Sequence, residues 1–133
     1  MKFRMYAIIS FAVCALAAYP VFAATPSYAE AKTLADRDEA AVSRTQSADL
    51  LATQGAAIDR IIPQCAGTAG PSGMPPFVVV VELDAVGKVV TTWREGDSNF
   101  AVCFEQKLRA LALFVPPHAP FYTSFEMSMS HEP

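Results

Sequence analysis

Residues 77–84, Phe77 to Asp84 (FVVVVELD), decide the fold. Their β-branched side chains favour an extended strand, and valines on both faces indicate a strand in the centre of its sheet. The next residues end in Gly87, which is typical of a tight turn because glycine readily adopts a positive φ. The segment 88–95 (KVVTTWRE) is therefore predicted to return antiparallel to the first strand.

Two amphipathic helices are predicted, one before and one after this hairpin. The first begins with Ser47 as its N-cap and ends at Pro63, and its apolar residues recur at helical spacing. The second begins at Ser98, and its apolar stripe is interrupted by Lys107. That stripe consists of Phe100, Cys103, Phe104, Leu108 and Leu111.

Residues 121–129 (FYTSFEMSM) alternate between apolar and polar side chains, which predicts a strand with one buried and one solvent-exposed face. The last strand is expected to pair with the hairpin, and the helices to cover the apolar face of the sheet. The fold class is then α+β, in the order helix-strand-strand-helix-strand. It has two layers, a three-stranded antiparallel sheet with two helices packed on one face, and spans residues 47–133.

The segment 24–46 is rich in alanine and in charged residues but has few large apolar side chains. Its helix propensity is good, and we expect a flexible or helical segment that is surrounded by solvent. A partner-binding arm is the alternative interpretation.

Residues 1–23 have the layout of a secretory signal peptide. Two basic residues precede an uncharged apolar run over residues 5–18, and small residues flank a cleavage site after Ala23. Cleavage after Ala29 and retention as an anchor are the alternatives, although a membrane span takes about 20 apolar residues. We therefore expect a periplasmic protein with no stable membrane span after cleavage.

The charge of the chain argues against a nucleic-acid partner. Cleavage would remove two of the 10 Lys and Arg residues and none of the 13 acidic residues, which changes the formal net charge from −3 to −5. The remaining basic residues are scattered singly, and such a surface has no general attraction for nucleic acid.

An exported form would keep two cysteines, Cys65 and Cys103, and such a pair is expected to form a disulfide in an oxidising compartment. A catalytic thiol and a metal ligand are the alternatives. The sequence has no CxxC motif, and its two histidines do not recur at metal-ligand spacing. We expect neither a metal nor another cofactor.

Catalytic motifs do not stand out. The sequence contains no nucleophile elbow, no HExxH motif and no P-loop. Glu82 and Asp84 share a strand face, but nothing near them in the sequence would raise a carboxyl pKa, so a solvated strand end is the preferred interpretation. These observations favour a binding protein over an enzyme.

Two groups of residues are candidates for a binding surface, since aromatic residues and arginine dominate interface hot spots. The first is Trp93 with Arg94, and the second is Phe121 and Tyr122 with His118, which lies in a proline-rich loop. A core position for Trp93 is the alternative, because strict alternation would place it on the same face as Val89.

Residues 77–129 resemble the C-terminal domain of the TonB family, in the broad sense that includes TonB-like domains of exported bacterial proteins. The matching features are the strand 78–84, Gly87-Lys88-Val89, a helix capped by Ser98 with Cys103 and Leu111 inward, and the exit Phe114-Val115-Pro116-Pro117. The resemblance implies a module that binds a protein or peptide of the cell envelope, by adding a strand to its sheet edge.

An energy-transducing TonB keeps a membrane anchor and a long linker rich in proline, and residues 24–46 contain only Pro26. We therefore do not expect energy transduction. The alternative function is a small secreted inhibitor or immunity protein that neutralises a toxin or hydrolase, because size, export, the cysteine pair and acidic charge fit it equally well.

Overall fold

A computed structural model of the protein describes residues 23–70 and 73–128. The predicted signal peptide lies almost wholly outside these residues. The elements are α1 (Tyr28–Ala41), α2 (Arg44–Cys65), a short 3-10 turn (Ala66–Thr68), β1 (Phe77–Leu83), β2 (Val89–Glu95), α3 (Asn99–Leu108) and β3 (Phe121–Met127). The α+β class and the antiparallel three-stranded sheet are confirmed. Of the helices in the described part of the chain, none combines the length and the apolar character needed to cross a bilayer.

β1 is the central strand, because the sheet order is β2-β1-β3 and both pairings are antiparallel. Consecutive residues of a strand point to opposite faces, yet Val79, Val80 and Val81 are all fully buried. Both faces of β1 are therefore covered, as its run of valines predicted.

The turn between β1 and β2 depends on Gly87, which has a φ of +84°. A Cβ at this position would also clash with the carbonyl oxygen of Phe114, so close approach and backbone conformation both require glycine. The carboxylate of Asp84 closes the turn by accepting the N–H groups of Val86 and Lys88 at 3.0 and 2.9 Å.

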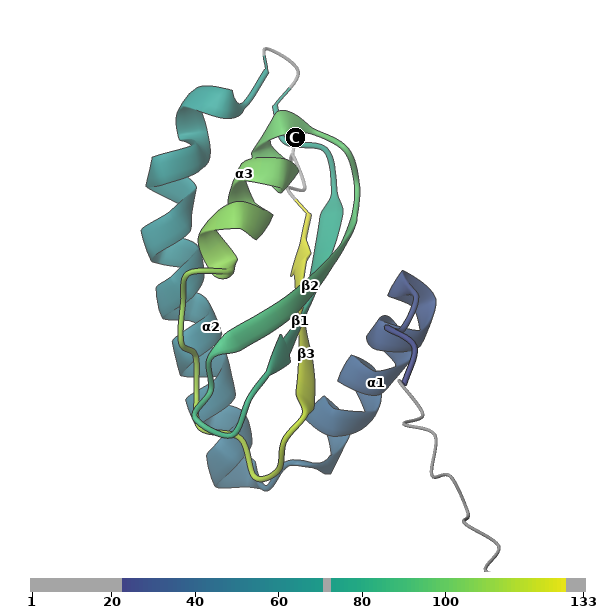
Figure 1. The fold of residues 1–133 in the computed structure, drawn as a ribbon. Helices are drawn as coiled ribbons and strands as arrows, with labels where there is room; N and C mark the ends of the chain where they lie inside the picture. Colours follow the sequence, from purple (N-terminus) through teal and green to yellow (C-terminus); the bar gives the residue numbers. More distant parts are fainter. Residues whose placement is uncertain (1–22, 71–72, 129–133) are drawn as a thin grey trace, which may run out of the picture.

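α2 and α3 cover one face of the sheet and enclose the larger core (Figure 1). The inward side chains of all three strands contribute to this core, and four phenylalanine rings from β1, α3 and β3 pack in one cluster. Their centroids lie 5.4–6.4 Å apart: Phe77, Phe100, Phe104 and Phe125.

The boundaries of α2 differ from the prediction at both ends. Ser43, not Ser47, is the N-cap: its hydroxyl accepts the N–H of Gln46, and the Gln46 side chain accepts the N–H of Ser43. The helix also continues through Pro63 to Cys65. A proline in the last turn removes one backbone hydrogen bond, and the two residues beyond it retain helical geometry.

α1 packs on the opposite face of the sheet, where the sequence led us to expect a solvated segment (Figure 1). Ser27 caps this helix and forms a capping box with Glu30. Ala31 and Ala35 are fully buried against Val80 and Tyr122, because small side chains let the helix backbone approach the strands closely. α1 thus adds a third layer to the two that were predicted.

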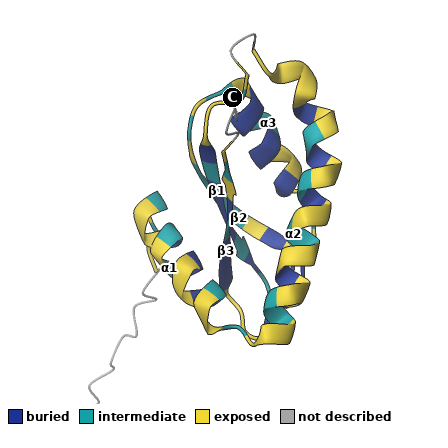
Figure 2. Cartoon of the chain, turned by 180° about the vertical axis from the view of Figure 1, so that it is seen from behind, coloured by how far each residue is buried: buried dark blue, intermediate teal, exposed yellow. Residues whose placement is uncertain are grey.

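The second face of β3 is consequently covered. Tyr122, which the alternating pattern placed on the solvent-exposed face, is only 7% exposed. The prediction of a solvent-exposed face was therefore wrong at this residue. The exposed faces of all three helices point outward and the buried positions lie against the sheet (Figure 2).

The predicted disulfide joins Cys65 at the end of α2 to Cys103 in α3, with a Cα–Cα distance of 5.8 Å. Cys65 is fully buried, and both cysteines belong to or pack against the larger core. The bond fastens the two helices to each other on the same face of the sheet.

Replacing both cysteines by alanine (C65A/C103A) should lower the free energy of unfolding by about 2–4 kcal/mol, since the bond closes a loop of 38 residues in the unfolded chain. Urea denaturation of the oxidised protein and of the variant measures this difference. Reduced wild-type protein should unfold like the variant. Equal stability of all three forms would contradict a stabilising role of the disulfide.

Candidate functional site

The residues that were predicted as binding candidates do not form one surface. Trp93 and Tyr122 lie together on the α1 face, with ring centroids 5.9 Å apart. The indole N–H of Trp93 donates to the carbonyl oxygen of Pro26 at 2.7 Å. Residue 26 and α1 thus cover Tyr122 almost completely and Trp93 in part, which leaves little of this aromatic pair for a partner to contact.

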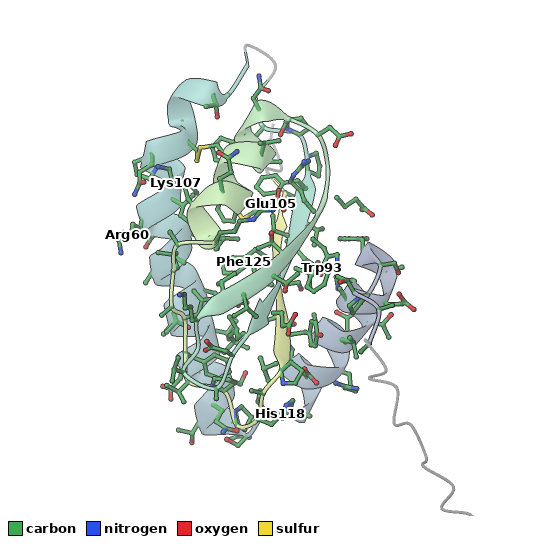
Figure 3. The ribbon with its side chains drawn as sticks, viewed as in Figure 1. Arg60, Trp93, Glu105, Lys107, His118 and Phe125 are labelled. Carbon is green, nitrogen blue, oxygen red and sulfur yellow. A yellow bond between two sulfur atoms is a disulfide. The ribbon has the colours of Figure 1, made fainter. Side chains whose placement is uncertain are left out.

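Trp93 does not share a face with Val89, because β2 contains a bulge. The register shifts between Glu82 and Leu83 of β1, and Val90 is the extra residue of β2 opposite that step. Val89 belongs to the core under α2 and α3, whereas Trp93 packs on the α1 side (Figure 3). Strict alternation was therefore the wrong assumption for this strand.

Arg94 lies on the face opposite to Trp93 and contacts α3. Its Nε donates to Glu105 Oε2 at 2.9 Å, and its Nη1 bonds the carbonyl oxygen of Gly96 and the exposed carboxylate of Asp97. Arg94 is thus a partly buried residue of a structural ion pair as well as a residue of the sheet edge.

Phe121 is fully buried in the larger core, and its ring packs against Phe114 at 5.2 Å. His118 is half exposed in the loop before β3, where its Nδ1 lies 3.0 Å from the carbonyl oxygen of Pro120. The ring of His118 lies 5.5 Å from that of Phe121. Of the three residues proposed for this second surface, His118, Phe121 and Tyr122, only His118 is open to solvent.

The outer edge of β3 is closed by side chains. Antiparallel pairing leaves every second residue of an edge strand with its N–H and C=O directed away from the sheet. The outward N–H of Tyr122 donates to Asp38 Oδ2 at 2.9 Å, and that of Ser124 donates to Glu39 Oε1 at 2.7 Å. Gln54 of α2 donates to the carbonyl oxygen of Ser124 at 3.1 Å. A strand could pair with Tyr122 and Ser124 only after these side chains move away.

Further contacts hold α1 in this position. Glu39 also accepts the hydroxyl of Thr123 at 2.6 Å, and Lys32 forms an ion pair with Glu126 at 2.8 Å. Asp38 is only 2% exposed, so its hydrogen bond to β3 is shielded from water. Removal of a buried acceptor of this kind costs about 1–3 kcal/mol.

The outer edge of β2 is closed only at its beginning, where the N–H of Val89 donates to the carbonyl oxygen of Leu111 at 3.1 Å. Beyond the bulge, the register directs the N–H and C=O groups of Thr92 and Arg94 away from β1. Among the described residues, none forms a hydrogen bond with these four backbone groups. This short open edge is the candidate site.

A polar cluster borders the open edge on the α3 side, centred on the carboxylate of Glu105. Besides Arg94, Glu105 accepts the hydroxyl of Thr92 at 2.9 Å and Nη2 of Arg109 at 3.1 Å. Burial by itself would raise the pKa of Glu105, but the hydrogen bonds from Arg94 and Thr92 and the charge of Arg109 outweigh it and lower that pKa. Glu105 is therefore ionised and fixed in place.

A hollow of about 370 Å³ lies beside the same edge, lined by residues 89–92 of β2 and by Arg109. A larger hollow of about 570 Å³ lies against the outside of α1. Two of its polar side chains, Glu30 and Thr33, already bond within α1 or its cap. Of these two hollows, the one at β2 combines open backbone groups with a cation.

The two carboxylates that were considered for catalysis, Glu82 and Asp84, lie at the end of β1 and in the turn that follows it. Asp84 closes the β1–β2 turn, and Glu82 is half-buried at the end of β1. Within residues 23–70 and 73–128, no three His, Cys, Asp or Glu side chains cluster in a way that could hold a metal ion.

Sequence reasoning missed the residues that distinguish the two edges. Glu105 of α3 and Arg109, which directly follows that helix, are spaced i, i+4, a pattern that favours an ion pair and was visible in the sequence. Asp38 and Glu39 gave no such signal, because the backbone groups that they bind lie about 85 residues away along the chain.

Comparisons of the chain with protein-family models, curated proteins and solved structures gave no significant match. The likeness to the TonB C-terminal domain therefore stays a prediction from the sequence.

The lowered pKa of Glu105 predicts a specific dependence of stability on pH. A carboxyl whose pKa is lower in the folded state adds stability above its unfolded value, near 4.5, and this contribution is lost as the pH falls toward the folded value. Glu105→Gln should lower the free energy of unfolding by about 1–3 kcal/mol at pH 7, with a smaller loss below pH 4. Chemical denaturation at several pH values measures this.

Asp97→Asn is the matched control, because Asp97 also contacts Arg94 but is fully exposed. It should leave stability nearly unchanged across the same pH range. An equal loss for Glu105→Gln at pH 3.5 and pH 7 would contradict the assignment.

Proposed function

We propose that the mature protein is an exported, periplasmic module of TonB-like fold that binds an extended segment of a cell-envelope protein. The segment adds as a fourth strand along the outer edge of β2. The observation that carries this proposal is the contrast between the two edges. Side chains of α1 and α2 occupy three outward backbone groups in the middle of β3, the N–H of Tyr122 and both groups of Ser124, whereas Thr92 and Arg94 of β2 keep theirs open among the described residues. The protein is proposed to be a binding module and not an enzyme.

The compartment is supported by two features. The apolar run and cleavage pattern of residues 1–23 are typical of export, and the disulfide between Cys65 and Cys103 suits an oxidising compartment. The residues that follow the predicted cleavage site do not form a free linker, since α1 packs on the sheet. This supports a role other than energy transduction.

Backbone pairing gives a modest affinity on its own. Thr92 and Arg94 together offer about four hydrogen bonds to an added strand, which contribute roughly 4 kcal/mol in total. That free energy corresponds to a Kd of about 1 mM before the cost of ordering the segment. Side chains beside the edge must therefore supply most of the affinity and the selectivity.

Affinity capture from a native envelope fraction tests the proposal, with Thr92→Pro as the decisive variant. Proline removes the outward N–H at position 92 and is tolerated on an edge strand, because that N–H takes no part in the ladder with β1. Thr92→Val is the matched control, since it loses the same hydroxyl but keeps the N–H. Thermal melting verifies that both variants fold.

Wild type and Thr92→Val should retain the same envelope protein, and Thr92→Pro should lose it. Equal capture by all three would contradict strand addition at β2, and capture of nothing above background would contradict the binding role. Recovery of one stoichiometric secreted toxin or hydrolase would identify the protein as an inhibitor instead.

A further inference from the structure

The hollow beside the open edge contains a positive charge that the fold does not fully neutralise. Arg109 follows α3, and its side chain is 59% exposed. Its Nε donates to the hydroxyl of Thr92 at 2.8 Å and its Nη2 donates to Glu105 at 3.1 Å. A guanidinium has five N–H donors, and among the described residues the other three have no partner.

The two contacts to Thr92 and Glu105 fix the guanidinium before any ligand arrives. A side chain that is already held loses less conformational freedom on binding, and the planar fork of arginine can bind a carboxylate through two parallel bonds. Arg109 is thus arranged as a receptor for a carboxylate at the edge of the sheet.

The charge around Arg109 favours an anion. The single carboxylate of Glu105 is shared between Arg94 and Arg109, so it neutralises only one of the two cations. Asp97 contacts Arg94 but not Arg109, and it is fully exposed, where solvent screens its charge.

The register of an added strand brings one of its side chains to this cation. Thr92 lies opposite Val81, on the α2 and α3 side of the sheet, and its hydroxyl contacts Arg109. The residue that pairs with Thr92 would point to the same side, with its Cβ about 5 Å from that of Thr92. Val90, which is 52% exposed, offers an apolar wall for the stem of that side chain.

We infer that the segment bound at β2 carries an acidic residue opposite Thr92, whose carboxylate enters the hollow and pairs with Arg109. This inference rests on the proposed strand addition and names the class of ligand: an extended acidic peptide. The ion pair with Arg109 would also provide the sequence specificity that backbone hydrogen bonds cannot supply.

A random peptide library displayed on phage and panned on the oxidised domain tests the inference. Peptides selected by the wild type should share an Asp or Glu at one position within a β-favouring segment, and Thr92→Pro should not retain them. Arg109→Gln should select strand-like peptides without that acidic preference. Lys107→Gln is the matched control, since Figure 3 shows Lys107 on the side of α3 that faces α2.

Binding constants of one selected peptide and its Glu→Gln or Asp→Asn analogue then close a thermodynamic cycle. The analogue should bind wild type and Lys107→Gln about fivefold to tenfold more weakly, and both peptides should bind Arg109→Gln equally. Strand-like ligands that depend on the Thr92 N–H but show no acidic preference would overturn the inference and leave strand addition standing. Selection of no ligand by wild type would overturn both.

Discussion

The two carboxylates near the end of α1 determine which edge of the sheet is available. Asp38 and Glu39 accept the outward N–H groups of β3, and Asp38 does so from a position that water hardly reaches. An edge strand with free backbone groups is a template for pairing with another chain. By occupying the middle of the β3 edge, α1 leaves the far side of β2 as the more open edge among the described strands.

The bulge in β2 gives this open edge its chemistry. The extra residue, Val90, shifts the alternation so that Trp93 packs under α1 while Thr92 and Arg94 face α3. Without that shift the polar side chains of the strand would lie on the other face, away from Glu105. Backbone groups for pairing and a cluster of arginines around one carboxylate thus lie side by side.

Much of the fold could be predicted from the sequence, because the decisive signals are local. The valines of β1, Gly87 and the N-cap Ser98 each act within a few residues, and the structure agrees with all of them. The docking of α1 could not be predicted, because Ala31 and Ala35 give its sequence little apolar character. Their burial depends on contacts with Val80 and Tyr122, which are distant in the sequence. The bulge carries no glycine or other local marker, so the faces of β2 were misassigned and Trp93 was expected on the same face as Val89.

The contrast between the edges is tested most directly by hydrogen exchange of individual backbone amides, followed by NMR. In the isolated wild-type domain, the amides of Tyr122 and Ser124 should exchange slowly and those of Thr92 and Arg94 rapidly. Glu39→Ala should accelerate hydrogen exchange of the Ser124 amide. Asp36→Ala, which removes a carboxylate from the same helix, should leave that exchange rate unchanged. Strong protection of Thr92 and Arg94 in the isolated domain, or no effect of Glu39→Ala on Ser124, would contradict the account.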